Sequence, residues 1–381
     1  MIYIAVFLVS CIFFWLSEKC KSGFSKNFFA VIAILVPCIL AGMRADTIGT
    51  DVKVYVEPLY NAAKQSTSFF SYMNQRWFYI WRYKYVYDFE IGFILLVYLI
   101  EKIGGSIGLV LFFIHILVLS LIYLGLKRIN KRYPIWLGML VFYMLFYNTS
   151  LNMMRQWIAM SILFYGLCYL LEHKKKKYFI VVIAACLFHT SALVGFAIYF
   201  LYMYSQKQRE YIRFANFRLD GSLAPIKLFI YGCIVLLSLN IIAVLLRAIG
   251  LAKYTGYIQG NSSIYLMPNQ IILRLPIIIL LVIRWKRMMA EDELTPFYGS
   301  MIVLDLLASQ LISINVYAFR IASFFSEYNM LSYSALVYAG NRKYRANRYI
   351  TLLYVLAYII YYWIYYYVIT GTHATFPYVF A

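Results

Sequence analysis

The chain has 381 residues, of which 64% are hydrophobic and only 13% are charged, and its formal net charge is +20. A soluble domain is about half apolar and about a quarter charged, so this composition needs lipid as solvent and excludes an ordinary soluble protein. The positive charge lies in short clusters between apolar runs and not on one basic domain, so we expect no nucleic-acid partner.

Apolar runs of spanning length recur along the whole chain. The first run has no basic segment before it and is followed by Lys19, Lys21 and Lys26, which predicts a retained first helix with its N-terminus outside, not a cleavable signal peptide. Residues 88–103 and 178–204 are also apolar but ambiguous. The predicted spans are residues 1–16, 27–43, 106–126, 134–148, 153–172, 226–249, 269–286, 295–315, 320–340 and 349–369.

The basic residues decide the predicted topology, because cytoplasmic loops carry an excess of Lys and Arg. If residues 88–103 crossed completely, the cluster after residue 126 would fall outside. This segment is therefore predicted to be a short helix that dips into, or lies on, the outer face. Residues 178–204 must leave the cytoplasm and return, which predicts two short helices broken near His189. The clusters expected to face the cytoplasm are Lys127, Arg128, Lys131 and Arg132; Lys174 to Lys177; Lys207, Arg209, Arg213 and Arg218; Arg284, Lys286 and Arg287; and Arg342, Lys343, Arg345 and Arg348.

These segments predict an all-α fold, with a single integral membrane domain over residues 1–381. We expect a polytopic protein of about 10–12 transmembrane helices plus short re-entrant or interfacial helices. Both termini are expected outside, and the 44–88 extracytoplasmic loop is long and rich in Tyr, Trp, Arg and Asp. Long loops of this kind are often functional. The other expected outer segments are 149–152, 250–268, 316–319 and the tail 370–381.

Arg44 ends the second predicted span and a polar loop follows it. Gly49 permits a tight turn there, and Asp51 follows the turn with a positioned carboxylate. The alternative interpretation is an ordinary interface loop that is anchored by Tyr and Arg side chains.

Asn152, Arg155 and Gln156 open the span predicted at 153–172. Their spacing places all three on one helix face at a helix N-terminus, where free N–H groups favour anions. The Arg155 guanidinium can grip two phosphate oxygens at once. The pattern predicts a diphosphate cradle; a helix cap with a snorkelling arginine is the alternative.

His189 lies at the expected break between the two short helices, where a neutral imidazole can accept a proton from a hydroxyl. The alternative is a hydrogen-bonded interior histidine.

Arg320 begins another helix whose N-terminus is expected to face outward, so it is a second candidate ligand for a diphosphate, for the same reason as Arg155. Gln270 and Arg274 lie one turn apart near the outer end of the 269–286 span. Asp305 and Glu327 fall well inside spans, where a charge costs about 2.5–3.5 kcal/mol on insertion scales, so we expect them to be paired. The expected partners are Arg274, Arg247 or the other carboxylate through a shared proton, and Glu327 is also placed to orient Arg320.

The sequence lacks the motifs of several common enzyme classes. There is no Walker motif, no GxGxxG after a strand, no DxD-type triplet and no G-x-S-x-G elbow. The six cysteines contain no CxxC pair, so no zinc site or disulfide framework is predicted. We therefore expect that the protein binds no metal and no cofactor. An activated lipid-linked donor is expected to supply the free energy of the reaction.

An ordered series of motifs runs over nearly the whole chain: Arg44, Gly49-Thr50-Asp51 and Tyr55; Glu90-Ile91-Gly92-Phe93; Asn152, Arg155, Gln156 and Ala159; His189, Ser191 and Ala192; Arg320; and Pro377-Tyr378. Each motif is weak alone. Together, with the lysine run between Arg155 and His189, they make a chain that resembles the EpsG family of Wzy-like exopolysaccharide and capsule polymerases.

The resemblance implies a metal-independent glycosyltransferase with a GT-C-like helical fold in the bacterial cytoplasmic membrane and an extracytoplasmic active site. Undecaprenyl-diphosphate-linked oligosaccharide is implied as both donor and acceptor, with the diphosphate lipid as leaving group. Membrane lipids, a chain-length regulator and a flippase are the other expected partners.

In this mechanism two arginines, Arg155 and Arg320, hold the donor diphosphate. Asp51, Glu90 and His189 are the candidate bases for the acceptor hydroxyl. His189 is slightly preferred, because a catalytic role would explain why the helix is broken at this position. The further expected diphosphate ligands are Arg44, Arg274, Asn152 and Gln156.

Other functions fit the same composition. A ligase shares the donor and differs only in the acceptor. A flippase or transporter predicts polar residues spread through the midplane, whereas the ionisable residues here crowd the outer third. A membrane acyltransferase would take its acyl donor from the cytoplasm, opposite the expected position of His189 and the arginines.

Overall fold

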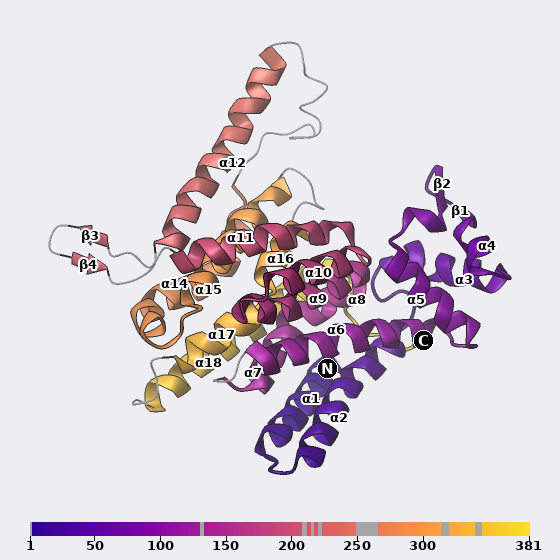
Figure 1. Cartoon of the computed structure of the whole chain (residues 1–381), viewed down its shortest axis with the longest axis horizontal. Helices are drawn as coiled ribbons and strands as arrows, with labels where there is room; N and C mark the ends of the chain where they lie inside the picture. Colours follow the sequence, from indigo (N-terminus) through magenta and orange to yellow (C-terminus); the bar gives the residue numbers. More distant parts are fainter. Residues whose placement is uncertain are drawn as a thin grey trace. The chain divides into compact units, whose positions relative to one another are not determined.

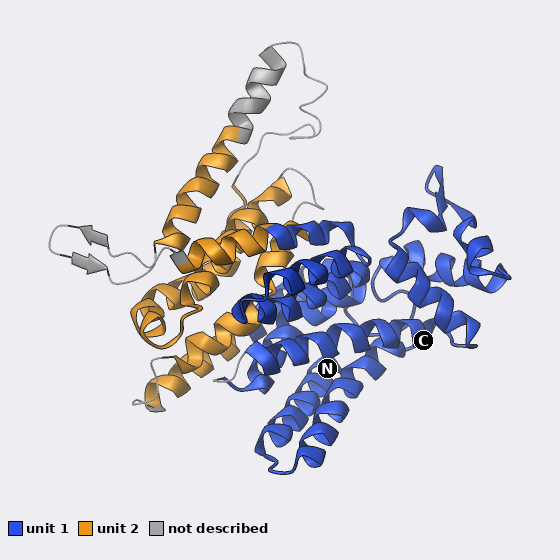
Figure 2. Ribbon diagram, in the orientation of Figure 1, with its two compact units in different colours: residues 1–196, 359–381 blue, residues 197–358 orange. Residues whose placement is uncertain are grey.

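The structure is a computed structural model that describes residues 2–129, 133–207, 212–214, 217–219, 223–248, 266–313, 320–339 and 345–381. The chain forms two compact units, Met1–Phe196 with Ile359–Ala381 and Ala197–Tyr358 (Figure 2). Some expected features lie outside the described residues: the loop 316–319, most of the loop 250–268, the basic residues Lys131, Arg132, Arg209, Arg342 and Lys343, and the side chains of Arg213, Arg218 and Arg247.

Six helices in the described part of the chain are long and apolar enough to cross a membrane. They confirm the predicted polytopic, almost entirely helical membrane fold. Other predicted spans appear as helices that are shorter or interrupted, and these do not meet the same criteria of length and hydropathy. The six helical segments are Ile2–Lys19, Gly23–Gly42, Ile107–Ile129, Met154–Leu171, Thr295–Ser313 and Ala346–Ile369.

The first unit contains the N-terminal half of the chain and its last residues (Figure 1). Its long helices alternate with short ones that carry the polar residues. The elements are α1 (Ile2–Lys19), α2 (Gly23–Gly42), η1 (Val52–Val56), α3 (Glu57–Gln65), α4 (Phe69–Met73), β1 (Arg76–Tyr79), β2 (Arg82–Tyr85), η2 (Val86–Asp88), α5 (Ile91–Lys102), α6 (Ile107–Ile129), α7 (Ile135–Phe142), η3 (Tyr143–Tyr147), α8 (Asn148–Asn152), α9 (Met154–Leu171), α10 (Lys175–Cys186), η4 (Thr190–Leu193), η6 (Ile364–Ile369) and η7 (Thr372–Ala374).

Helices α2 and α6 approach closely at one end of this unit. A Cβ atom on Gly42 would lie 2.9 Å from the Gly108 carbonyl oxygen, and one on Gly108 would lie 2.6 Å from the Gly42 oxygen. Glycines at both positions therefore permit backbone contact between the two helices, as small residues commonly do in membrane proteins. This contact fixes the end of α2 from which the loop with Arg44 departs.

The segment 44–88 is folded. After the turn at Gly49 the chain forms η1, α3 and α4, and then a hairpin in which Arg76 pairs with Tyr85 and Tyr79 with Arg82. Aromatic side chains pack along this segment, with the Trp77 ring stacked on Phe89. The sequence predicts a long aromatic loop here, and these helices and this hairpin were not predicted.

Two interruptions of the helices, at Met153 and between Cys186 and Thr190, place polar residues in the first unit. Residues 135–152 form α7, the π-helical turn η3 and α8, and the helix direction is interrupted at Met153 (φ −86°, ψ 53°) before α9 begins. Helix α10 ends at Cys186 and η4 begins at Thr190. The predicted break near His189 and the predicted short helix at 88–103, here α5, are both confirmed.

The second unit contains the remaining elements. Its core residues come mainly from α15 and α17, whose side chains are nearly all buried. The elements are most of α11 (Val194–Lys207), β3 (Ile212–Phe214), β4 (Phe217–Leu219), α12 (Ala224–Ala248), α14 (Pro268–Glu291), α15 (Thr295–Ser309), η5 (Gln310–Ser313), α16 (Arg320–Ser326), α17 (Asn329–Tyr338) and most of α18 (Arg345–Trp363).

Candidate functional site

Asn152 is the last residue of α8 and joins two segments that are distant in sequence. Its side-chain oxygen accepts hydrogen bonds from the Thr50 hydroxyl and from the backbone N–H of Asp51, both at 3.1 Å. Its amide nitrogen lies 3.1 Å from His373 Nδ1. The helix break at Met153 frees Asn152 from the α9 face, so the side chain holds the 49–52 turn in place.

Gly49 is required at this turn for two reasons. Its φ is +80°, in the left-handed region that favours glycine, as the sequence predicted. A Cβ atom there would also lie 2.9 Å from the Leu151 carbonyl oxygen. The turn therefore rests directly on the end of α8.

Arg44 lies beneath the turn and is only 2% exposed. Its Nη2 donates to the Leu151 carbonyl oxygen at 2.9 Å and lies 3.2 Å from Met154 Sδ, while Nε and Nη1 make no hydrogen bond with the described residues. Burial lowers the pKa of Arg44 to about 10, against the opposing effect of tyrosines such as Tyr147, so the group stays charged at neutral pH. It places a buried positive charge at the α8–α9 break.

Arg155 is held between two aromatic rings. Its guanidinium carbon lies 4.8 Å from the centre of the Tyr55 ring and 4.9 Å from that of Phe89. Its Nη1 forms an ion pair with Glu90, and Nε makes no hydrogen bond with the described residues. With 21% of its side chain exposed, Arg155 is a positioned, partly accessible cation.

Glu90 precedes α5 and is fixed from two sides. Its second oxygen accepts from the Thr190 backbone N–H at 3.1 Å. Burial raises the pKa of Glu90, but the Arg155 charge and the hydrogen bonds outweigh burial, so the pKa lies below its usual value. Gly92 permits this contact, because its N–H donates to the Leu187 oxygen at 2.8 Å and a Cβ atom would lie 2.8 Å from the same oxygen.

His189 caps η4 from the break before it. Its Nδ1 accepts from the Ser191 backbone N–H at 3.2 Å and lies 2.6 Å from the Ser191 hydroxyl. A backbone N–H can only donate, so in the neutral ring the proton lies on Nε2. In this arrangement His189 presents a donor, and its accepting nitrogen is engaged by Ser191.

Asp51 lies half-buried between Asn152 and Tyr55. Its Oδ2 accepts a hydrogen bond from the Tyr55 hydroxyl at 2.9 Å. Burial and the Asp51 charge raise the pKa of Tyr55 well above its usual value, so the phenol remains a donor. Tyr55 thus supports the Asp51 carboxylate with its hydroxyl and Arg155 with its ring.

The structure therefore joins five of the predicted residues with Tyr55 through this network of contacts, hereafter the polar cluster: Asp51, Tyr55, Glu90, Asn152, Arg155 and His189. The expectation that Asn152, Arg155 and Gln156 share one helix face is wrong. Asn152 precedes the break, and Gln156 is buried in α9 with its amide 3.7 Å from Met160 Sδ.

His373 is a residue of this site that the sequence analysis missed. It lies in the C-terminal segment, 221 residues from Asn152 in sequence, and its short-range pattern carries no motif. Its φ of 71° in a non-glycine residue is visible only in the structure.

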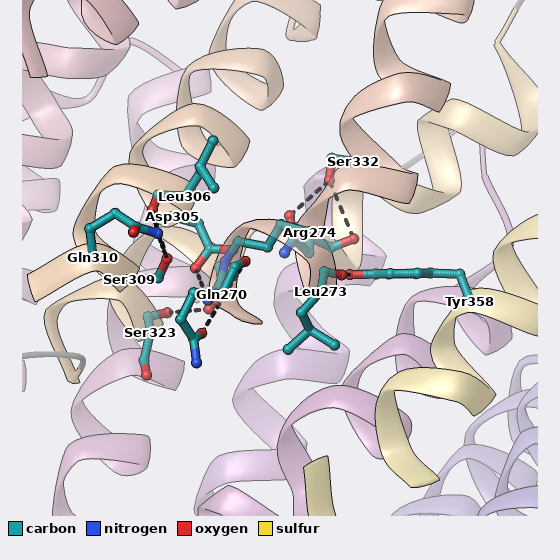
Figure 3. Close-up of polar contacts among 12 residues, drawn as sticks. Gln270, Leu273, Arg274, Asp305, Leu306, Ser309, Gln310, Ser323, Ser332 and Tyr358 are labelled. Carbon is teal, nitrogen blue, oxygen red and sulfur yellow. Dashed lines mark hydrogen bonds and ion pairs between the residues drawn. The ribbon is translucent and has the colours of Figure 1, made fainter. Parts of the chain in front are cut away.

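Arg274 belongs to the second unit and is engaged there by an acidic partner (Figure 3). Its Nε donates to Asp305 Oδ2 at 2.8 Å, its Nη2 to Asp305 Oδ1 at 3.0 Å, and its Nη1 to Gln270 Oε1 at 2.8 Å. The predicted pairing of Asp305 with Arg274 is confirmed. A diphosphate would have to compete with this bidentate ion pair.

Arg320 begins α16, also in the second unit. Glu327 follows α16 and is fully buried, and its carboxylate forms no hydrogen bond with the described residues. The expected pairing of Glu327 with Arg274 is wrong, because Asp305 and Gln270 surround that guanidinium. The described residues contain no group of three His, Cys, Asp or Glu side chains placed to hold a metal ion.

A polytopic helical membrane protein with charged and aromatic residues gathered at one end of a helical unit is the class that this fold and site define. The profile of the EpsG family matches residues 27–380. The chain belongs to the EpsG family, which implies a role in exopolysaccharide biosynthesis. No curated protein and no solved structure matches the chain.

Proposed function

We propose that this protein is a polysaccharide polymerase that joins undecaprenyl-diphosphate-linked repeat units at the outer face of the cytoplasmic membrane. Family membership supports a role in exopolysaccharide synthesis. The observation that carries the finer proposal is Arg155, clamped between Tyr55 and Phe89 at a helix start, with the Asp51 carboxylate hydrogen-bonded to the same Tyr55.

The proposed reaction is a glycosyl transfer. The acceptor hydroxyl oxygen forms a bond to the anomeric carbon of the donor, and the bond from that carbon to the diphosphate oxygen breaks. The electron pair leaves with the lipid diphosphate, and the hydroxyl proton passes to a base. Arg155 opposes the charge that develops on the leaving diphosphate, which is the kind of electrostatic stabilisation that contributes most in many enzymes.

Asp51 is the base that the contacts favour. Glu90 is already committed to Arg155 and Thr190, and its lowered pKa makes it a weak base. The accepting nitrogen of His189 is engaged by Ser191, so its Nε2–H suits a donor to phosphate or sugar. Asp51 is oriented by Tyr55 and by the Asn152-held turn.

The remaining predicted ligands take secondary roles in this proposal. Arg320, at the start of α16, is a second candidate cation for a diphosphate. Arg44 raises the positive potential at the α8–α9 break from beneath. Asn152 orients the 49–52 turn, Gln156 packs within α9, and Arg274 is engaged by Asp305 in its own unit.

The outer location is supported by the charge pattern within the first unit. Helices α6 and α9 end at Ile129 and Leu171, near Lys127, Arg128 and Lys174 to Lys177, and Arg128 pairs with Glu172 at that end. Arg155 lies at the opposite end of α9, roughly 27 Å away for 18 residues. The positive-inside rule therefore favours a cytoplasmic position for the basic end and an outer position for Arg155.

Replacing Arg155 tests the proposal. Proteoliposomes with purified protein receive lipid-linked repeat units extracted from a strain that lacks the polymerase, and glycan length is followed on gels. We expect Arg155→Ala to slow elongation about 100-fold, and Arg155→Lys to retain part of the activity because the charge remains but the fork is lost.

Arg128→Ala is the matched control, since Arg128 also pairs with a glutamate and lies 4.8 Å from the centre of a tyrosine ring, that of Tyr169. It should elongate normally. Elongation by correctly inserted Arg155→Ala at the rate of the unmodified protein would show that the leaving-group role is wrong.

A further inference from the structure

We propose that His373 is a positioning residue of the polar cluster and that residues 371–381 form a C-terminal clamp that holds the Gly49–Asp51 turn against α8. The clamp itself is a structural inference about this chain, and only its effect on elongation rests on the proposed function. His373 acts through Asn152, which in turn holds the backbone of Asp51.

Hydrogen-bond direction fixes how His373 works. The Asp51 backbone N–H can only donate, so the Asn152 atom that faces it at 3.1 Å is the carbonyl oxygen. The Asn152 amide nitrogen therefore faces His373 and donates to Nδ1. This requires an unprotonated Nδ1, so His373 serves as an acceptor that completes the hydrogen bonding of a side chain only 7% exposed.

The clamp contacts the turn at Gly49 and the segment that precedes it. The Gly49 N–H donates to the Ala374 oxygen at 3.0 Å, and the Ala45 N–H donates to the Val379 oxygen at 2.9 Å. At the end of the chain the Ala381 N–H donates to the Met43 oxygen at 2.9 Å. The C-terminal segment thus pairs along the loop that carries Asp51.

Buried side chains anchor the clamp to the transmembrane core. The Tyr3 hydroxyl donates to the Thr375 carbonyl oxygen at 2.6 Å, and the Asn148 amide lies 3.1 Å from the Thr375 hydroxyl. Thr375 is fully buried, and the Tyr378 hydroxyl donates to the Leu40 oxygen at 2.6 Å. The clamp is therefore bound to α1, α2 and α8 at once.

The backbone of the clamp is in an unfavourable conformation at two non-glycine residues. His373 has φ 71° and Ala374 has φ 51°, in the left-handed region that costs most residues free energy. Such a conformation persists only where surrounding contacts determine it. The contacts at this place are those that aim the His373 ring at Asn152 and the Ala374 carbonyl at Gly49.

The first experiment measures the turn directly. Amide hydrogen exchange of residues 45–56 is compared in the unmodified protein, His373→Ala and His373→Asn. We expect faster exchange in His373→Ala and recovery in His373→Asn, whose side-chain oxygen can accept from Asn152 and which tolerates the left-handed backbone.

His173→Ala is the matched control, because His173 is also a histidine in the left-handed region (φ 56°) but is exposed and lies at the basic end of α9. It should leave the exchange of residues 45–56 unchanged. This comparison shows whether alanine at a positive φ elsewhere in the same unit changes the exchange of residues 45–56.

The second experiment asks whether His373 acts through Asn152. In the elongation assay, His373→Ala should lower kcat roughly 10- to 100-fold with a smaller change in KM, as expected for a misplaced catalytic group. His373→Ala should have little added effect in an Asn152→Ala background, because a double-mutant cycle reports coupling between residues that act together.

The outcomes distinguish the two proposals. Unchanged exchange in His373→Ala, or additive effects with Asn152→Ala, would overturn the positioning role while leaving the polymerase proposal intact. Faster exchange with full elongation would uphold the clamp and count against Asp51 as the base. If Arg155→Ala elongates normally, the polymerase mechanism fails, and the exchange data still decide the clamp.

Discussion

Arg155 and Glu90 form an ion pair that is enclosed by the rings of Tyr55 and Phe89. The pair connects the start of α9 with the start of α5, and Glu90 extends the connection to Thr190 at the next helix break. An unpaired arginine that is mostly buried would be costly, whereas the paired Arg155 is held in a defined direction. The pair therefore both stabilises three chain breaks and orients the candidate diphosphate ligand.

Glu90→Gln should weaken this connection, because it removes the charge while keeping the shape. We expect a loss of about 1–3 kcal/mol in the free energy of unfolding at pH 7. The folded-state pKa of Glu90 is lowered, so its contribution is present above the ordinary carboxyl value and is lost as pH falls through the folded pKa. Thermal unfolding in detergent from pH 7 to pH 3 should show the two proteins converging at low pH; a constant difference would contradict the assignment.

Gly49→Ala should disturb the polar cluster more than the same change at Gly104. Both glycines have a φ near +80°, but a Cβ atom on Gly104 meets no atom within 4 Å, whereas one on Gly49 meets the Leu151 backbone at 2.9 Å. Gly104→Ala should therefore cost about 1–2 kcal/mol of stability. Gly49→Ala should cost more and slow elongation; equal effects at the two positions in thermal unfolding would show that the close approach is unimportant.

Tyr55→Phe should separate the two functions of Tyr55. The ring over Arg155 remains, but Asp51 loses the hydroxyl that donates to it at 2.9 Å. We expect elongation to fall roughly 10-fold while stability changes by about 1 kcal/mol. Tyr60→Phe removes a hydroxyl that donates to Gly105 at 2.8 Å in the same segment, and it should change stability alone. Equal elongation rates for the two variants would mean that Tyr55 does not support a catalytic Asp51.

Asp305→Ala should destabilise the second unit, because it leaves the Arg274 guanidinium buried without its carboxylate (Figure 3). Breaking a buried ion pair costs about 3–5 kcal/mol. Asp46→Ala is the control, since Asp46 pairs with Lys53 at 3.2 Å with both side chains about half exposed, and should cost at most about 1 kcal/mol. The double variant Asp305→Leu with Arg274→Met should recover stability in denaturation experiments, because neither charge is then left buried without a partner. Failure to recover would show that the ion pair contributes more to stability than the mutual neutralisation of its two charges.

Hydropathy and charge were sufficient to predict a polytopic, nearly all-helical membrane protein and two of its irregularities. The break near His189 and the short helix α5 followed from counting which basic clusters must share one side. The pairing of Asp305 with Arg274 followed from the cost of a lone charge inside a span. These features depend on local composition, which a sequence displays directly.

The internal arrangement of the site was harder to predict. The break at Met153 was not foreseen, so Asn152 was placed on the face of Arg155 instead of against Asp51. His373 was missed because its partner lies 221 residues away. The hairpin β1–β2 was missed because aromatic and basic residues alternate there without the hydrophobic pattern of a strand.

The sequence by itself determined that this chain crosses a membrane repeatedly, that it belongs with a polysaccharide-synthesis family, and which residues carry charge near helix ends. Only the tertiary structure decided that Asn152 joins Asp51 to His373 and that Arg155 pairs with Glu90 between two rings. The physical reason is range. Transfer of apolar side chains to lipid is a property of each segment alone, whereas the direction of a hydrogen bond or an ion pair depends on backbone turns that bring distant segments within about 3 Å of one another.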